Sequence, residues 1–276
     1  MNFNKAPVDI PQGRRKIMNT SAQDDLMLTK EMVGGIPILE CYKRDGRRKP
    51  LVILSHGFTE NKERWTPQLN SLAEHGYYAA ALDNHNHGER KEPDFASQVF
   101  SGSKLKLHEV RRLIKETAED ISRLIDHFTR SEEVDQDRIG MAGVSMGGFT
   151  TFRALVIEKR IKAAAPVISS PYWDDIPQGV PVADDAESQQ TLASISHAYS
   201  PALFPELFFP RPLLIQIGDQ DGHYVPDRVK QFYEQLKSGY YKEEPQRLKL
   251  ICHEGVGHEF TPAMWANVMD WFKKYL

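Results

Sequence analysis

Short apolar runs alternate along the chain with longer segments in which apolar residues recur at helical spacing. The runs at 51–55 and 77–82 are apolar almost throughout, a pattern typical of strands that are covered on both faces. Between 105 and 128, apolar residues recur every three or four positions, which predicts a long amphipathic helix. The pattern as a whole predicts strands near 36–42, 51–55, 77–82, 138–142, 161–168, 212–217 and 247–252, and helices near 66–74, 105–128, 149–158, 225–237 and 264–275.

Strands and helices alternate through most of this pattern, and the strands are too apolar to face water. A mostly parallel sheet with helices on both faces satisfies both conditions, so the predicted fold class is α/β. In such a sheet the carboxyl ends of the strands meet at one edge, where ligands bind. Functional side chains are therefore expected in the loops that follow the strands.

Three segments need a separate interpretation. Residues 1–30 are polar and mixed, and are predicted to form an N-terminal arm with a short helix around 24–29. The charged turn 43–49 has Asp45-Gly46 at its centre, which predicts a hairpin. The helix at 105–128 is expected to turn its charged residues to solvent. Those residues are Arg111, Arg112, Lys115, Glu116, Glu119 and Asp120.

Residues 169–210 differ in composition from the rest of the chain. They hold six prolines and six acidic residues but no lysine or arginine. We interpret them as a cap-like insertion at the carboxyl edge of the sheet, within a single domain that spans 1–276. The aromatic residues of this insertion either form a partial lid with an apolar inner face or pack on the sheet as ordinary core. The residues in question are Tyr172, Trp173, Tyr199, Phe204 and Phe208.

Composition excludes several classes of function. The 276 residues carry a formal net charge of −3, which gives no sign of a nucleic-acid partner. No stretch is long or apolar enough to span a membrane, and the N-terminus has no secretory pattern. Cys41 and Cys252 cannot form a disulfide framework and are expected to be reduced thiols of a cytoplasmic protein. The oligomeric state does not follow from the sequence.

The chain is organised around Gly143-Val144-Ser145-Met146-Gly147. An apolar run precedes this motif and a helix-like segment follows it, which is the context of a nucleophile elbow. A serine on so sharp a turn projects from the carboxyl edge of the sheet, and glycines on both sides leave room for the neighbouring backbone. Ser145 is therefore a candidate nucleophile.

A serine nucleophile needs a base within hydrogen-bond reach and a carboxylate that orients the base. The loop after the strand at 212–217 holds Asp219 and Asp221, and the loop after 247–252 holds His253 and His258. The order along the chain is serine, aspartate, histidine. The pattern alone leaves both aspartates and both histidines open.

The loop 83–88 contains His85-x-His87, a spacing that could chelate a metal ion. No neighbouring carboxylate or histidine cluster in the sequence completes such a site. We therefore expect two histidines in a polar loop over the sheet, with no metal and no organic cofactor.

These motifs together resemble the α/β-hydrolases, close to the prolyl-oligopeptidase-like and dienelactone-hydrolase-like esterases. The residues that carry the resemblance are Ser55-His56-Gly57-Phe58, Asp137-Arg138-Ile139-Gly140, Gly143-Val144-Ser145-Met146-Gly147-Gly148, Gly218-x-x-Asp221 and Gly257-His258. The resemblance implies Asp221 as the acid and His258 as the base, with the amides of Phe58 and Met146 as the oxyanion hole. One departure, Asn84-His85-Asn86-His87-Gly88, is expected to reshape one wall of the pocket.

The resemblance implies a serine hydrolase that cleaves carboxylic esters, with a small-molecule ester as its partner. The insertion at 169–210 is short, so the pocket is expected to be shallow and suited to small acyl groups. The alternatives are an aminopeptidase or acylpeptide hydrolase, and a non-catalytic binding protein with the same fold. The acidic insertion at 169–210 further predicts that neutral esters are preferred over carboxylate-bearing ones, because like charges near the mouth would repel an anion.

Overall fold

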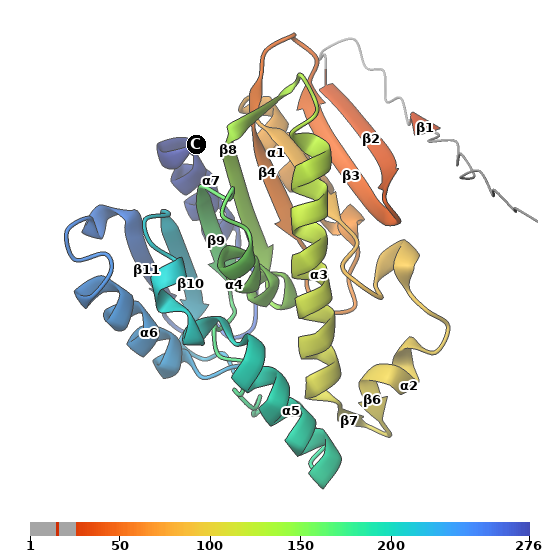
Figure 1. Cartoon of the computed structure of the whole chain (residues 1–276), viewed down its shortest axis with the longest axis vertical. Coiled ribbons are helices and arrows are strands. Elements are labelled where there is room, and N and C mark those ends of the chain that lie inside the picture. The colour runs from red at the N-terminus through yellow and green to blue at the C-terminus, as the bar shows by residue number, and fades with distance from the viewer. Residues whose placement is uncertain (1–14, 17–25) are drawn as a thin grey trace, which may run out of the picture.

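The strands form one central sheet. The computed structural model describes residues 15–16 and 26–276. Within that part of the chain, nine strands pair in the order β1-β2-β3-β5-β4-β8-β9-β10-β11 (Figure 1). Their bounds are β1 Arg15–Lys16, β2 Leu26–Val33, β3 Ile36–Lys43, β4 Lys49–Ser55, β5 Tyr78–Leu82, β8 Val134–Val144, β9 Ala163–Val167, β10 Leu213–Gly218 and β11 Leu248–His253.

The strands from β5 to β11 in this order are parallel, and β3, β2 and β1 continue the sheet as antiparallel neighbours. The register pairs Ser55 of β4 with Gly143 of β8, and Gly218 of β10 with His253 of β11. The loops after these four strands therefore start at one edge of the sheet. The predicted α/β class with a mostly parallel sheet is confirmed.

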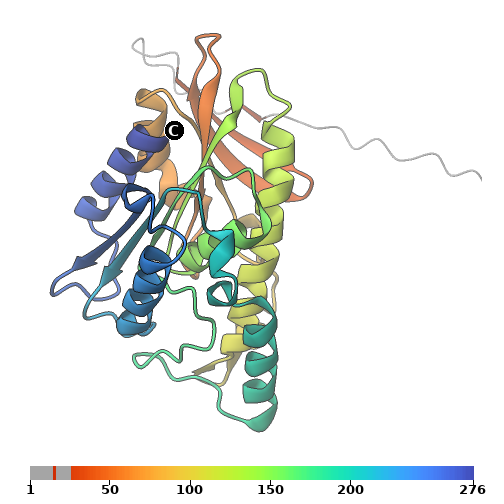
Figure 2. The same cartoon turned by 60° about the vertical axis from the view of Figure 1, so that its left-hand side comes forward.

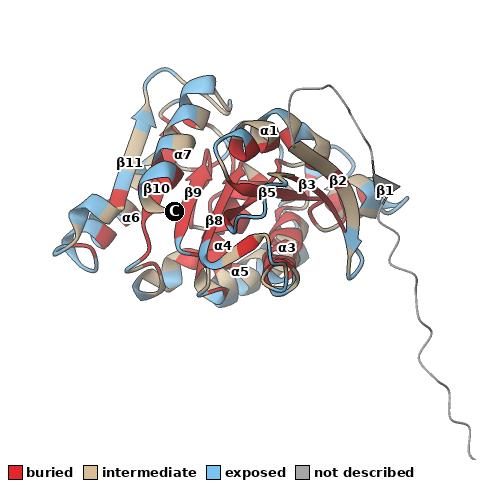
Figure 3. Cartoon of the chain, turned by 90° about the horizontal axis from the view of Figure 1, so that it is seen from above, coloured by how far each residue is buried: buried red, intermediate tan, exposed pale blue. Residues whose placement is uncertain are grey.

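Helices cover both faces of the sheet. Helices α1 and α7 lie on one face, and α3, α4 and α6 lie on the other (Figure 3). The bounds of the α-helices are α1 Thr66–Glu74, α2 Phe95–Val99, α3 Leu107–Phe128, α4 Met146–Ile157, α5 Ala186–Tyr199, α6 Pro226–Ser238 and α7 Pro262–Tyr275. The 3-10 helices are η1 Lys62–Trp65, η2 Gly88–Arg90, η3 Pro201–Leu203, η4 Pro205–Leu207 and η5 Pro245–Arg247. None of the helices in the described part of the chain has both the length and the apolar character that crossing a membrane requires.

Strands β4, β5 and β10 are buried along their whole length, which explains why they are apolar on both faces. The predicted single domain over 1–276 stays a prediction, and most of its N-terminal arm lies outside the described residues.

Two local predictions near the N-terminus are wrong. Leu26 to Thr29 lie in strand β2 and not in a helix, because residues at alternate positions, Leu26 and Leu28, pack against the core. The turn 43–49 is not a hairpin, since β5 lies between β3 and β4 in the sheet. The hairpin forms instead between β2 and β3, where Gly34 and Gly35 both have positive φ angles.

The polar face predicted for the helix at 105–128 is wrong at two positions. Arg111 and Asp120 of α3 are buried. Asp120 accepts a hydrogen bond of 2.6 Å from Arg90 Nη1, and Arg111 Nε donates one of 3.0 Å to the carbonyl of Trp173. Helical periodicity identifies the side that packs on the sheet, but it cannot show that other segments cover the opposite side.

Two connections, not one, cover the carboxyl edge. The insertion 169–210 contains helix α5, and Asp185 caps its N-terminus by accepting a bond of 2.9 Å from the Ser188 amide. The connection after β5 adds α2 and a small hairpin of β6 Phe100–Ser101 and β7 Lys104–Leu105. Leu105 joins the two connections, because its amide donates to Pro181 and its carbonyl accepts from Ala183, both at 2.8 Å. Figures 1 and 2 show both segments beyond the ends of the central strands.

The lid interpretation is wrong for two aromatic residues near the two ends of the insertion. Trp173 and Phe208 are fully buried. Phe208 packs edge-on against Phe152 of α4 and Phe232 of α6. These rings therefore belong to the core between the helices and the sheet, which was the alternative left open by the sequence.

A buried polar network fixes the loop after β4. Asn84 donates from its backbone amide to His56 Nε2 at 3.1 Å and from Nδ2 to the His56 carbonyl at 2.9 Å, while Ser55 Oγ donates to Asn84 Oδ1 at 2.8 Å. His56 Nδ1 then carries the proton and donates to the Gly57 carbonyl at 2.7 Å. All three polar side chains are fully buried. A second proton on His56 would break the bond from the Asn84 amide.

This network predicts a loss of stability in acid. Burial lowers the pKa of His56 from 6.5 to about 4. The unfolded chain therefore binds a proton between these pH values while the folded chain does not, so the free energy of unfolding falls as the pH drops below 6.5. The contribution of His56 to that loss is about 2 kcal/mol at pH 5.

Urea denaturation of the wild type and of His56→Asn at pH 7 and pH 5 measures this contribution. The variant should lose less stability between the two pH values than the wild type. Equal losses in the two proteins would show that His56 is not the group responsible.

Candidate active site

Ser145 lies at the sharp junction between β8 and α4. Its backbone has φ 55° and ψ −118°, a conformation that residues with a side chain rarely adopt. The Ser145 amide donates to the carbonyl of Val167 in β9 at 3.0 Å, which ties the turn to the neighbouring strand. The junction therefore has the geometry expected of a nucleophile elbow.

Two glycines make this junction possible. A Cβ atom added to Gly143 would lie 2.1 Å from the carbonyl oxygen of Gly147, and one added to Gly147 would lie 2.0 Å from the carbonyl oxygen of Ser55. Both distances are far below van der Waals contact. Only glycine at both positions lets the first turn of α4 approach the end of β4 this closely.

Ser145, His258 and Asp221 form a continuous hydrogen-bonded chain. Ser145 Oγ lies 2.7 Å from His258 Nε2, and His258 Nδ1 lies 2.8 Å from Asp221 Oδ2. Asp221 follows β10 and its side chain is fully buried, whereas the His258 side chain, between β11 and α7, is 19% exposed. The three predicted residues are thus brought together from three separate loops.

The two alternatives left open by the sequence face elsewhere. Asp219 Oδ1 accepts a hydrogen bond of 2.7 Å from the Gly255 amide. His253 Nε2 lies 3.1 Å from Gln216 Oε1 on the neighbouring strand. Asp219 therefore shapes the loop that carries His258, and His253 pairs within the sheet.

The predicted oxyanion-hole amides belong to Phe58 and Met146. Met146 is the first residue of α4, where an amide has no acceptor within its own helix. Neither amide donates to any of the acceptors found among the described residues. The loop of Phe58 lies beside the serine, since a Cβ added to Gly57 would be 3.8 Å from Ser145 Cβ.

A cavity of about 530 Å³ opens at Ser145 and His258. Its walls are mostly apolar and come from both connections over the carboxyl edge. They include Phe58, Phe100, Leu105, Leu107, Val110, Arg111, Phe149, Ile168, Pro177, Val180, His223 and Phe260. None of the residues 84–88 lines this cavity, but the His87 ring packs edge-on against Phe58, which does, with ring centroids 5.4 Å apart. That the departure at 84–88 reshapes a wall stays a prediction.

Sequence reasoning missed part of this lining. The segment 88–106 contributes Phe100 and Leu105, and its short hairpin gives no strong periodic signal. Arg111 was assigned to solvent. The alternation of charge with apolar residues around 111 could not show that a cavity lies beside that face.

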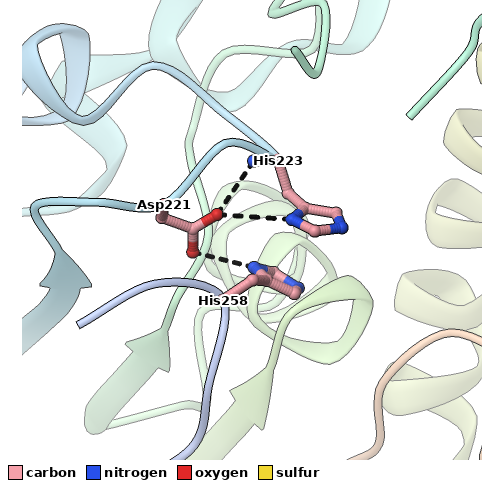
Figure 4. Close-up of side chains that lie close together, drawn as sticks. All are labelled: Asp221, His223 and His258. Carbon is pink, nitrogen blue, oxygen red and sulfur yellow. Dashed lines mark hydrogen bonds and ion pairs between the residues drawn. The ribbon is translucent and has the colours of Figure 1, made fainter. Parts of the chain in front are cut away.

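His223 stacks on the candidate base. The rings of His223 and His258 have centroids 3.8 Å apart and an interplanar angle of 25°, and the His223 amide donates to Asp221 Oδ1 at 2.9 Å (Figure 4). Burial lowers the pKa of His223, and the charge that His258 carries when protonated lowers it further. Both effects favour the neutral form of the His223 ring.

One group of described side chains could hold a metal ion, because one ligand atom of each lies within 4.8 Å of the others. The group consists of Asp221, His223 and His258. A metal on His258 Nδ1 would displace its hydrogen bond to Asp221. His85 and His87 do not combine in this way, because His85 faces Glu116 and Arg90 while His87 Nδ1 lies 2.9 Å from the His85 carbonyl.

The chain matches the protein family described as serine aminopeptidase, S33, over residues 46–195. It is 34% identical to "Putative esterase YitV" of Bacillus subtilis (strain 168), with 91% of this chain and all of that protein covered. It is 23% identical to "Esterase YjfP" of Escherichia coli (strain K12), with 87% and 96% covered.

The crystal structure of TT1662 from Thermus thermophilus is similar with a TM-score of 0.73 and 25% identity, covering 90% of this chain and 97% of that one. Family, relatives and fold agree with the geometry around Ser145. The chain belongs to the serine aminopeptidase S33 family of the α/β-hydrolases, and it is a hydrolase.

Proposed function

We propose that the protein hydrolyses carboxylic esters of small acyl groups through Ser145, His258 and Asp221. The observation that carries this proposal is the unbroken chain of short contacts from Ser145 Oγ through the imidazole to the buried Asp221 carboxylate. A binding protein with this fold would have no need of all three groups in register. Two relatives named as esterases support the same reaction class.

In the first half of the reaction, Ser145 Oγ attacks the ester carbonyl carbon while its proton passes to His258 Nε2. The carbonyl oxygen becomes an oxyanion and accepts hydrogen bonds from the amides of Phe58 and Met146. Asp221 stabilises the imidazolium through Nδ1–H. The C–O bond to the alcohol then breaks, and the alcohol leaves with the proton from Nε2.

In the second half, a water molecule gives a proton to His258 Nε2 and attacks the acyl carbon on Ser145. The same two amides hold the second oxyanion. The bond from Ser145 Oγ to the acyl carbon breaks, the acid is released, and the serine recovers its proton. No metal or organic cofactor is needed in this scheme.

An aminopeptidase is the second candidate, because the family carries that description. Such an enzyme needs an acidic group at the cavity that pairs with a free α-amino group. Glu60 supplies the one carboxylate among the described residues that line the cavity. This carboxylate already accepts a hydrogen bond of 2.9 Å from the Gly57 amide and pairs with Arg64 at 2.6 Å. This pairing favours an ester substrate.

The preference for small acyl groups is supported by the inner wall of the cavity. Arg111 lies against Phe149, one helical turn after Ser145. A long apolar chain along that wall would leave the unpaired Nη donors of the buried guanidinium without a hydrogen-bond partner, which is unfavourable.

The cytoplasmic location stays a prediction, and it is consistent with Cys41 and Cys252 being free thiols.

Replacing the nucleophile tests the proposal directly. Ser145→Ala should lower ester hydrolysis by roughly a millionfold without loss of folding, because the three groups act as a unit. Ser194→Ala, on the exposed side of α5, is the matched control and should keep wild-type rates. Substantial esterase activity in folded Ser145→Ala would remove Ser145 from the mechanism.

The two aspartates after β10 give a paired test of the acid. Asp221→Asn should reduce kcat on the order of ten-thousandfold, because an amide at Asp221 favours the wrong tautomer of His258. Asp219→Asn should cost far less, since it perturbs only the contact with Gly255. Steady-state rates that rank the two variants in the opposite order would move the acid to Asp219.

Acyl size can be measured on the wild type alone. The value of kcat/KM should be higher for ethyl acetate and ethyl butyrate than for ethyl octanoate, because the longer apolar chain offers no hydrogen-bond partner to the unpaired Nη donors of Arg111. A clear preference for the octanoyl ester would contradict the small-acyl proposal while leaving the serine mechanism intact.

A further inference from the structure

Arg111 is a buried arginine with most of its donors unused. Its side chain is 2% exposed, and it makes one hydrogen bond, from Nε to the Trp173 carbonyl at 3.0 Å. The guanidinium carbon lies 4.3 Å from the centroid of the Phe149 ring. No other hydrogen bond or ion pair to this side chain is found among the described residues, so the donors on Nη1 and Nη2 are left for a ligand.

The acidic residues nearest to Arg111 are already paired with another arginine. Asp175 and Asp174 lie 2.5 Å and 3.1 Å from Arg228 Nη1, and Asp175 Oδ2 also accepts from Ser170 Oγ at 2.8 Å. Burial lowers the pKa of Arg111 to about 10, and these two carboxylates oppose that effect. Arg111 is therefore positively charged at neutral pH without a partner carboxylate of its own.

Arg111 lines the same cavity as the candidate nucleophile, Ser145. Phe149, the ring beneath the guanidinium, lies in the first turn of α4, and its amide donates to the Ser145 carbonyl at 3.0 Å. A group that reaches one helical turn beyond the reacting carbonyl would therefore meet the guanidinium.

Two other arginines in the described part of the chain are buried, and their contacts can be compared with those of Arg111. Arg211 donates to the carbonyls of Phe208, Glu158 and Leu155, and Arg153 donates to the Tyr199 carbonyl and lies over the Tyr199 ring. Neither lines the cavity. Arg153 thus resembles Arg111 in making one hydrogen bond to a carbonyl and one contact with a ring, and what distinguishes Arg111 is its place at the cavity.

The remaining charges on the cavity do not compensate Arg111. Glu60 and Arg64 pair with each other at 2.6 Å. No acidic residue of the insertion lines the cavity. The predicted repulsion of anions thus has no source at the cavity wall, and the unbalanced charge there is positive.

We infer that Arg111 binds a carboxylate of the substrate, so that the natural substrates are small esters that carry a carboxylate group. This inference rests on the proposed ester hydrolysis at Ser145. A planar carboxylate matches the forked donors of a guanidinium, and pairing there removes the unfavourable burial of an isolated charge. The carboxylate sits on either the acyl or the alcohol part of the ester, and the test separates the two.

The test uses two pairs of nearly isosteric esters. Monoethyl succinate against ethyl butyrate places the carboxylate on the acyl part, and 3-acetoxypropanoate against propyl acetate places it on the alcohol part. The wild type should show a higher kcat/KM for the charged ester in one of the two pairs. Within that pair, Arg111→Met should lower the ratio of charged to neutral kcat/KM by roughly ten- to a hundredfold.

Arg153→Met is the matched control, because it also removes a buried arginine that contacts a carbonyl and an aromatic ring but does not line the cavity. It should leave the ratio unchanged. The ratio is measured within one preparation, so it does not depend on how much of a variant folds. If Arg111→Met yields no folded protein, the ratio of charged to neutral kcat/KM is compared between the wild type and Arg111→Lys instead.

A wild type that prefers the neutral ester in both pairs would overturn the inference, as would equal ratios in the wild type and a folded Arg111→Met. Either result would leave the proposed function in place if the neutral esters are hydrolysed and Ser145→Ala abolishes that hydrolysis. Failure to hydrolyse any of the four esters would instead contradict the proposed function.

Discussion

The close approach of helix α4 to the ends of β4 and β8 is the constraint on which the candidate site depends. Gly147 lies so near the Ser55 carbonyl that no side chain fits, and Gly143 meets Gly147 in the same way. This contact forces Ser145 into a positive φ angle and directs its Oγ away from the sheet. It also brings the loop of Phe58 beside the first amide of α4. The candidate nucleophile and the proposed oxyanion donors are thus positioned by one packing contact.

The other parts of the site depend on the parallel order of the strands. Because β10 and β11 end at the same edge as β8, Asp221 and His258 reach Ser145 although 113 residues separate the serine from the histidine. The two connections over this edge, joined at Leu105, enclose the reacting atoms in mostly apolar walls. Within these walls a charge such as that of Arg111 interacts more strongly with a ligand than it would in water.

Much of this arrangement could be predicted from the sequence, and the reasons are physical. Continuous apolar runs identify strands such as β4 and β10 because both of their faces are buried. The glycines around Ser145 follow from local geometry. The loops after β10 and β11 each offer two candidates, and Asp221 and His258 were chosen among them because the chain resembles the α/β-hydrolases. The errors arose where a distant segment decides the outcome. The turn at Asp45-Gly46 suits a hairpin locally, yet β5 inserts between the strands it joins.

The same limit explains the errors around the cavity. Arg111 was assigned to solvent because helical periodicity reports only the face that packs on the sheet. The carbonyl of Trp173, 62 residues away in sequence, covers it. The prediction of a possible lid fails for Trp173 and Phe208, because both are fully buried, Phe208 between rings of α4 and α6. Side-chain environments made by three or more segments cannot be derived from one segment's pattern.

The central claim is that Ser145 is a nucleophile activated by His258 and served by an oxyanion hole. Labelling the folded protein with a fluorophosphonate, followed by peptide mass mapping, tests this claim most directly, because such a probe reacts with an activated serine and not with ordinary ones. The account predicts a single adduct per chain, on Ser145. Absence of an adduct, or an adduct on another residue with Ser145 unmodified, would contradict it.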